Sequence, residues 1–164
     1  MKALIERNLK VYFRDRASVF FSLLAVLIIF ALYLLFLGDV WVSNLPAVPG
    51  ARALMDNWII AGLLAVTAVT TVMGAFGTMV DDRSRHIIKD FSASPVGRSR
   101  IVAGYEVASF TVGTIMSLLT FALGEGYIVL RGGAALPVQS ALAVVGLIVL
   151  SALCNTAMIS LLIS

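Results

Sequence analysis

Hydrophobic residues fall into four long runs that carry almost no charge, separated by short polar segments. A helix rising ~1.5 Å per residue needs about 20 apolar residues to cross a hydrocarbon core of ~30 Å. The runs are residues 17–37, 58–80, 101–124 and 138–163. Each is long enough to span, so the pattern predicts an all-α membrane protein with about four transmembrane helices in one domain covering residues 1–164.

The first sixteen residues follow a different pattern. At helical spacing the apolar side chains share one side and the charged ones the other. The apolar set is Leu4, Ile5, Leu9, Tyr12 and Phe13, and the charged set is Glu6, Arg7, Lys10 and Arg14. Such a helix lies in the membrane interface instead of crossing the bilayer. We therefore expect an interfacial helix over residues 1–16; the alternative is a basic tail that only orients the first span.

The second run, residues 58–80, is rich in glycine, alanine and threonine. Small side chains let helix backbones approach closely in lipid, where hydrophobic burial does not drive helix association. We expect this span to be buried among other helices.

Residues 81–100 form the longest charged stretch between apolar runs and hold five of the twelve Lys and Arg residues. These are Arg83, Arg85, Lys89, Arg98 and Arg100. Ser84–Phe91 is predicted to be a short helix that ends before Pro95, since the residue preceding proline disfavours helical geometry. Ile87, Ile88 and Phe91 would share one face of it.

An apolar face between two spans has no core of its own to pack into. Residues 81–100 are therefore a candidate docking element for a soluble partner, with Arg83 and Arg85 beside the apolar face. The alternative is a solvated loop whose basic residues only set the topology, and composition does not separate the two.

Basic residues divide ten to two between the two sides of the membrane. Five precede the first span and five lie in the 81–100 loop, whereas the other two loops hold only Arg52 and Arg131. Because cytoplasmic loops carry the excess of Lys and Arg, the N terminus and the 81–100 loop are predicted to be cytoplasmic.

Composition supports a bilayer environment, since 60% of the residues are hydrophobic and 13% are charged, against about 25% charged in soluble proteins. The net charge of +3 does not indicate nucleic-acid binding, because the charges lie beside the spans and form no basic face. Cys154 is the only cysteine, so no internal disulfide forms. The first apolar run is too long for a cleavable signal peptide and should remain as an anchor.

No catalytic chemistry is evident in the sequence. It contains neither a GxxxxGK[ST] phosphate loop nor a GxSxG elbow, and His86 is the only histidine, so we expect no active site, metal or cofactor. Glu106, Glu125 and Asn155 are possible polar sites within or beside the spans. We interpret the two glutamates as interfacial carboxylates in preference to proton relays; Asn155 could hydrogen-bond between helices or line a path.

Two stretches together resemble the membrane subunit of ABC-2 type exporters. They are the N-terminal RNLKVYFRDRASVFFSLL and the central MVDDRSRHIIKDFSASPVGRSRIVAGY. The resemblance implies that Asp81–Phe91 is a coupling helix inserting into a cleft of an ATP-binding subunit, which hydrolyses ATP on a separate chain. It also implies a second permease subunit, in a homo- or heterodimer, and a place in the plasma membrane. The family has six spans, so we expect further spans after Ser164.

Two other functions are alternatives to that of an exporter subunit. A membrane adaptor or assembly protein would use the same 81–100 loop to hold a soluble partner. An ion-coupled carrier would use Glu106 or Glu125, but carriers place such groups near mid-membrane, and the central parts of these spans are uncharged.

Overall fold

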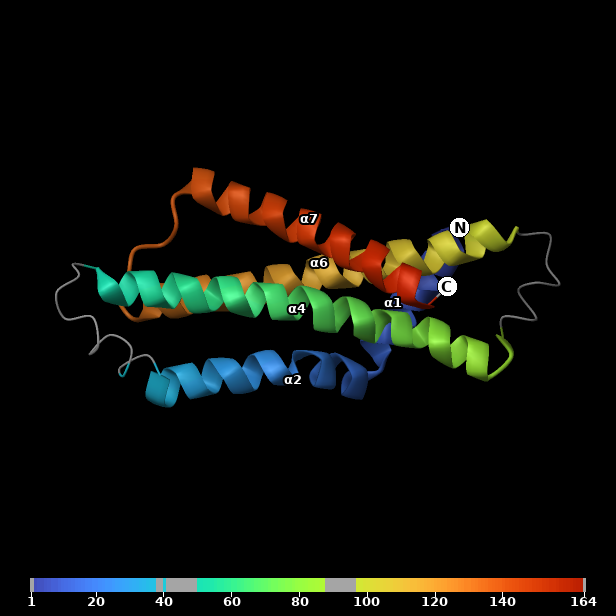
Figure 1. Ribbon diagram of the computed structural model, residues 1–164, viewed down its shortest axis with the longest axis horizontal. Coiled ribbons are helices and arrows are strands. Elements are labelled where there is room, and N and C mark those ends of the chain that lie inside the picture. The colour runs from blue at the N-terminus through green and yellow to red at the C-terminus, as the bar shows by residue number, and fades with distance from the viewer. Residues whose placement is uncertain (1, 38–39, 41–49, 88–96, 164) are drawn as a thin grey trace.

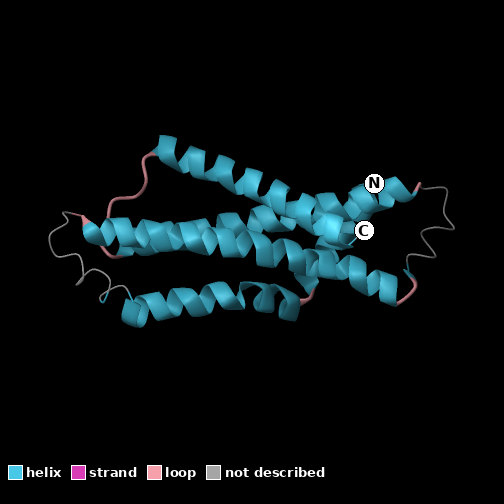
Figure 2. Ribbon diagram, viewed as in Figure 1, coloured by secondary structure: helices cyan, strands magenta, loops and turns pink. Residues whose placement is uncertain are grey.

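The computed structural model describes residues 2–37, 40, 50–87 and 97–163, and no strand occurs in these ranges (Figure 2). Its helices are α1 (Lys2–Arg14), α2 (Arg16–Leu32), a π-helical continuation of α2 named η1 (Tyr33–Leu37), α4 (Ala51–Ser84), α6 (Arg98–Leu130) and α7 (Val138–Ile163). Four stretches are long and apolar enough to cross a membrane: Arg16–Phe36, Ala51–Ser84, Ser99–Leu130 and Val138–Ile163. The predicted all-α class with about four spans is confirmed.

Helices α4 and α6 lie side by side at the centre of the bundle (Figure 1). Helix α2 packs on α4, and α7 packs on both α4 and α6. Both termini lie at one end of the bundle, which we call the N-terminal end; the opposite end is the distal end. Helix α7 meets its neighbours near the N-terminal end and diverges from them toward the distal end.

Helix α4 begins earlier than the sequence predicted. Residues 38–57 were expected to be a polar, turn-rich loop, but the helix starts at Ala51, directly after Gly50 with its φ of +78°. No proline or glycine lies between Ala51 and Asn57 to interrupt the helix. With 34 residues α4 is about 51 Å long and extends beyond a hydrocarbon core of ~30 Å.

Helix α6 also runs past its expected end at Gly124. It continues to Leu130, and Arg131 is its C-terminal cap. The next residue, Gly132, adopts a φ of +81°. Glycine weakens a helix by about 1 kcal/mol relative to alanine without blocking it. The Gly124-Glu125-Gly126 stretch therefore stays helical, and the chain turns only where a glycine takes the left-handed conformation.

The contact between α4 and α6 is close because of a glycine. A Cβ atom on Gly113 would lie 2.4 Å from Cγ2 of Val72, whose side chain is fully buried. Further along the same interface, the hydroxyl groups of Thr67 and Thr120 are 3.2 Å apart and hydrogen-bonded. In the most apolar part of each span, 44% of the residues are buried in α4 and α6, against 17% in the first span and 22% in α7. The expectation that the second span is buried among helices is confirmed.

Helix α1 packs against the bundle through an aromatic side chain. Tyr12 is 2% exposed and forms a core cluster with Ala75, Val112 and Met116. Its hydroxyl is hydrogen-bonded to Ser22 Oγ at 2.9 Å. The chain turns between α1 and α2 at Asp15, whose carboxylate accepts hydrogen bonds from the backbone N–H groups of Ala17 and Ser18 and so caps α2. The amphipathic N-terminal helix is thus tied to the spans.

Candidate functional site

The candidate docking segment starts within α4. Asp81–Ser84 form the last turn of that helix, one turn beyond the predicted boundary at Val80. The backbone N–H of Arg85 donates to the carbonyl of Asp81 at 2.9 Å, and His86 has a φ of +64°, the left-handed conformation that often follows a helix end. The predicted short helix therefore does not begin at Ser84, because that residue and the turn after it terminate α4.

The structure describes only part of the predicted docking face. Arg83 and Arg85 are exposed, and Ile87 is half-buried. Ile88 and Phe91 lie outside the described residues, and α6 already begins at Arg98. The shared apolar face of Ile87, Ile88 and Phe91 stays a prediction.

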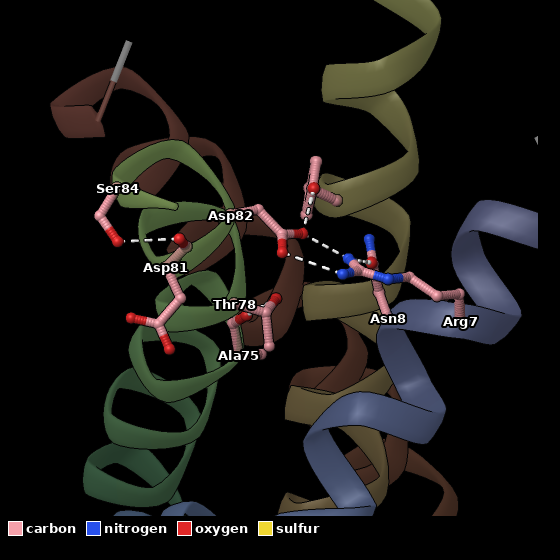
Figure 3. Close-up of polar contacts among 8 residues, drawn as sticks. Arg7, Asn8, Ala75, Thr78, Asp81, Asp82 and Ser84 are labelled. Atoms are coloured by element: carbon pink, nitrogen blue, oxygen red, sulfur yellow. Dashed lines mark hydrogen bonds and ion pairs between the residues drawn. The ribbon is translucent and has the colours of Figure 1, made fainter. Parts of the chain in front are cut away.

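A partly buried ion pair lies at the start of this segment. Arg7 Nη2 donates to Asp82 Oδ1 at 2.9 Å, and Arg7 Nη1 bonds the other carboxylate oxygen, Oδ2 (Figure 3). The Tyr105 hydroxyl also donates to Oδ2, at 2.5 Å. Arg7 belongs to α1, Asp82 to the last turn of α4 and Tyr105 to α6, so one carboxylate joins three helices.

The surroundings of Asp82 explain why it needs these partners. Its side chain is 7% exposed, and a buried carboxylate is costly unless it is paired and hydrogen-bonded. A bidentate arginine fork is a strong and geometrically specific partner. The pKa of the Arg7 guanidinium is raised above its ordinary value, chiefly by its hydrogen bond to Asp82. The neighbouring Asp81 is exposed and points away from Arg7 (Figure 3).

Asn8 lies beside the ion pair. It is 2% exposed, and its Oδ1 accepts a hydrogen bond from Arg7 Nη1 at 3.0 Å. This contact helps to orient the guanidinium toward Asp82. Asn8 Nδ2 is buried without a hydrogen-bond partner among the described residues.

Sequence reasoning missed this cluster. Arg7 was placed on the polar side of an interfacial helix, and Asp82 was assigned to a cytoplasmic loop. The available signal was the acidic pair at the end of an apolar run together with an arginine among the first residues. Because Arg7 and Asp82 are 75 positions apart, no local pattern connects them.

A second buried carboxylate, also missed, lies toward the distal end. Asp56 of α4 is 6% exposed and accepts a hydrogen bond from the hydroxyl of Tyr33 at 2.5 Å. Tyr33 begins η1 and is 2% exposed. This bond fastens the end of the first span to α4, and the sequence reading placed Asp56 in a loop.

The three predicted polar sites do not come together. Glu106 accepts a hydrogen bond from Ser160 of α7 at 2.5 Å. Glu125, near the other end of α6, accepts one from the backbone N–H of Leu136 at 3.1 Å, and its Oε1 is buried without a partner among the described residues. Asn155 donates to Ser151 within its own helix at 3.3 Å. In the described part of the chain no three His, Cys, Asp or Glu side chains are grouped so that they could hold a metal.

Comparison with known proteins identifies the family of this chain. The family model for ABC-2 type transporters matches residues 1–164. The chain belongs to the ABC-2 type transporter family. Membrane domains of this family are permease components and not catalytic subunits, and family membership implies partnership with an ABC ATP-binding subunit in general. This ABC-2 type chain is therefore a multi-pass transport permease. No curated protein and no solved structure matches it.

Proposed function

We propose that this chain is the membrane-spanning subunit of an ATP-driven exporter. It forms a translocation path together with a second permease subunit and couples to a separate ATP-binding subunit through residues 81–100. In this proposal the protein lies in the plasma membrane, with the N terminus and the 81–100 segment in the cytoplasm. The division of basic residues, ten against two, supports that orientation.

The ion pair between Arg7 and Asp82 carries the proposal. Asp82 is in the last helical turn before the 81–100 segment leaves α4, and Tyr105 is in the second turn of α6, after the segment has returned. A displacement of this segment by a partner would therefore act on α4, α6 and α1 together. Hydrogen-bond and salt-bridge networks are one of the ways in which energetic coupling passes between helices, and a bidentate arginine–carboxylate pair is strong and geometrically specific.

The partner contact would combine an apolar face with surrounding charge. Burying Ile87, Ile88 and Phe91 would contribute about 1.5–3 kcal/mol for each side chain fully removed from water. Arg83 and Arg85, exposed at the end of α4, would steer the encounter and set its register more than its strength. Reversing both charges should weaken binding in a salt-dependent way, since exposed charges are screened.

The test replaces Ile88 and Phe91 with serine in the full-length protein. Co-purification of the ATP-binding subunit and stimulation of its ATPase activity by substrate should both fall, while membrane insertion is unchanged because both residues lie outside the spans. Val138→Ser is the matched control, since Val138 is 78% exposed at the distal end of the bundle. Wild-type association and ATPase stimulation in the double variant would contradict the proposal. Loss of a bound protein that has no ATPase activity would instead favour a membrane adaptor.

A further inference from the structure

Two arginines flank the turn that joins α1 to α2 near the N-terminal end of the bundle (Figure 1). Arg14 is the last residue of α1, Arg16 is the first residue of α2, and Asp15 lies between them. Both arginines are exposed. Neither makes a hydrogen bond or an ion pair with the part of the chain that the structure describes. The turn therefore presents two guanidinium groups that are available to a ligand.

The carboxylate between the two arginines is already engaged. Asp15 accepts hydrogen bonds from the backbone N–H groups of Ala17 and Ser18 and, at 2.6 Å, from the Ser18 hydroxyl. Its negative charge is thus directed at the N-terminus of α2, where an anion is favourable. The backbone of the turn is also fixed, since the Asp15 N–H donates to the carbonyl of Val11 and the Asp15 carbonyl accepts from the N–H of Val19. Arg14 and Arg16 are therefore held two positions apart on a defined turn.

The length of the first span gives the depth of this turn in the membrane. Arg16–Phe36 comprises 21 residues and rises about 30 Å, which matches a hydrocarbon core of ~30 Å. Arg16 therefore lies at the edge of the core, and Arg14 lies in the adjoining headgroup layer, which is roughly 5–7 Å thick on each side. One helical turn further along α2, Phe20 is 53% exposed and Phe21 is 67% exposed, so both face the acyl chains just inside the core.

We infer that Arg14 and Arg16 bind the phosphate of an anionic phospholipid, whose acyl chains lie against Phe20 and Phe21. Guanidinium groups are well suited to phosphate, because their planar N–H fork matches its oxygen atoms. A zwitterionic lipid also carries a phosphate, but its choline cation would lie beside the two arginines and reduce the attraction. In the orientation proposed above, the site faces the cytoplasmic leaflet, which carries the anionic lipids.

An acidic surface of a soluble protein fits these residues less well. To reach Arg16 it would have to displace the headgroups down to the edge of the hydrocarbon core, and Phe20 would remain in contact with lipid. The apolar side of α1 does not provide a competing lipid contact, because Leu4 covers Gly104 of α6 and Tyr12 packs against Ala75 and Val112. The turn itself is therefore where this part of the chain meets the lipid headgroups.

Native mass spectrometry of the full-length protein in a neutral detergent tests this site, with phosphatidylglycerol as the anionic probe and phosphatidylcholine as the zwitterionic one. We expect a saturable phosphatidylglycerol adduct that forms at a lower lipid concentration than the phosphatidylcholine adduct. Arg14→Gln and Arg16→Gln should each raise the half-saturating concentration about fivefold, the effect of one basic residue near an anionic membrane surface. Arg16→Lys keeps the charge and should lose less. Glycerol phosphate, which has no acyl chains, should not displace the lipid.

Arg131→Gln separates this site from a general effect of charge. Arg131 is exposed at the distal end, after α6, and its replacement changes the net charge by the same amount, so this variant should bind phosphatidylglycerol like the wild type. An equal loss in Arg131→Gln and Arg14→Gln, or equal binding of the two lipids by the wild type, would overturn the assignment. Unchanged lipid binding in Arg14→Gln and Arg16→Gln would also overturn it, and reduced co-purification of an ATP-binding subunit with these variants would then assign the turn to a protein contact. The lipid measurement needs neither ATP nor a partner subunit, so its failure would leave the proposed exporter function untouched.

Discussion

Arg7 and Asp82 are 75 residues apart in the chain and form a bidentate ion pair that joins α1 to the end of α4. Exposed ion pairs contribute little to stability, but this pair differs in its surroundings. The Asp82 side chain is 7% exposed, whereas that of Arg7 is 35% exposed. Arginine therefore reaches from the surface to satisfy a carboxylate that water barely contacts, and this fastens the amphipathic helix to the spans.

Removing Arg7 should destabilise the folded protein by about 2–3 kcal/mol, because Arg7→Ala leaves a buried carboxylate with only the tyrosine as a strong partner. The thermal unfolding midpoint in detergent should fall accordingly. Lys10→Ala is the matched control, since Lys10 pairs with Glu6 on the surface of the same helix and both side chains are more than half exposed. That variant should unfold like the wild type.

A double-mutant cycle isolates the pair itself. If Arg7 and Asp82 interact as described, the Arg7→Ala, Asp82→Ala double variant should be destabilised by less than the sum of the two single variants. Strict additivity would show that each residue acts independently and would remove the basis for treating α1 and α4 as coupled.

The sequence predicted the spans well and their ends poorly, for a physical reason. Crossing a bilayer requires a long apolar run, and that requirement is visible in every span. Where a helix stops beyond the bilayer depends on local breakers, and Ala51–Asn57 contains none. Polar residues there had indicated a loop, yet α4 continues through them and buries Asp56 against Tyr33.

The polar contacts could not be predicted because they depend on tertiary structure. Glu106 was interpreted as an interfacial carboxylate, and no sequence pattern indicated that it accepts a hydrogen bond from Ser160 of α7. Asp82 and Arg7 each looked like ordinary membrane-flanking charges. The packing of α1 against α6, in which Leu4 covers Gly104, and against α4, in which Tyr12 contacts Ala75, brings the arginine within reach of the end of α4.

Close packing of α4 on α6 predicts opposite outcomes for two glycines. Gly113→Ala should destabilise the protein by about 1–3 kcal/mol, because its Cβ would lie 2.4 Å from the stiff, β-branched side chain of Val72. Gly77→Ala has no atom within 4 Å of the new Cβ and should be neutral or stabilising by up to about 1 kcal/mol through helix propensity. Equal thermal unfolding midpoints for the two variants would contradict the described interface.

The bond between Glu106 and Ser160 should hold α7 against α6 near the N-terminal end. Ser160→Ala and Glu106→Ala should each cost about 1–2 kcal/mol, and Glu106→Gln should cost less, because an amide oxygen still accepts from the serine hydroxyl. Thermal unfolding in detergent measures the series. A glutamine variant as unstable as the alanine variant would show that the carboxylate charge matters more than this hydrogen bond.

The orientation of the chain in the membrane can be tested by labelling single introduced cysteines. Cys154 is the only cysteine, so Cys154→Ser gives a background in which one new thiol reports one position. Because ten of twelve basic residues flank the N terminus and the 81–100 segment, Ser92→Cys should react with a membrane-impermeant maleimide only after the cells are permeabilised. Val48→Cys should react on intact cells. Labelling of Ser92→Cys on intact cells would show that the orientation is the opposite of the predicted one. The proposed coupling segment would then lie outside, where no ATP-binding subunit could reach it.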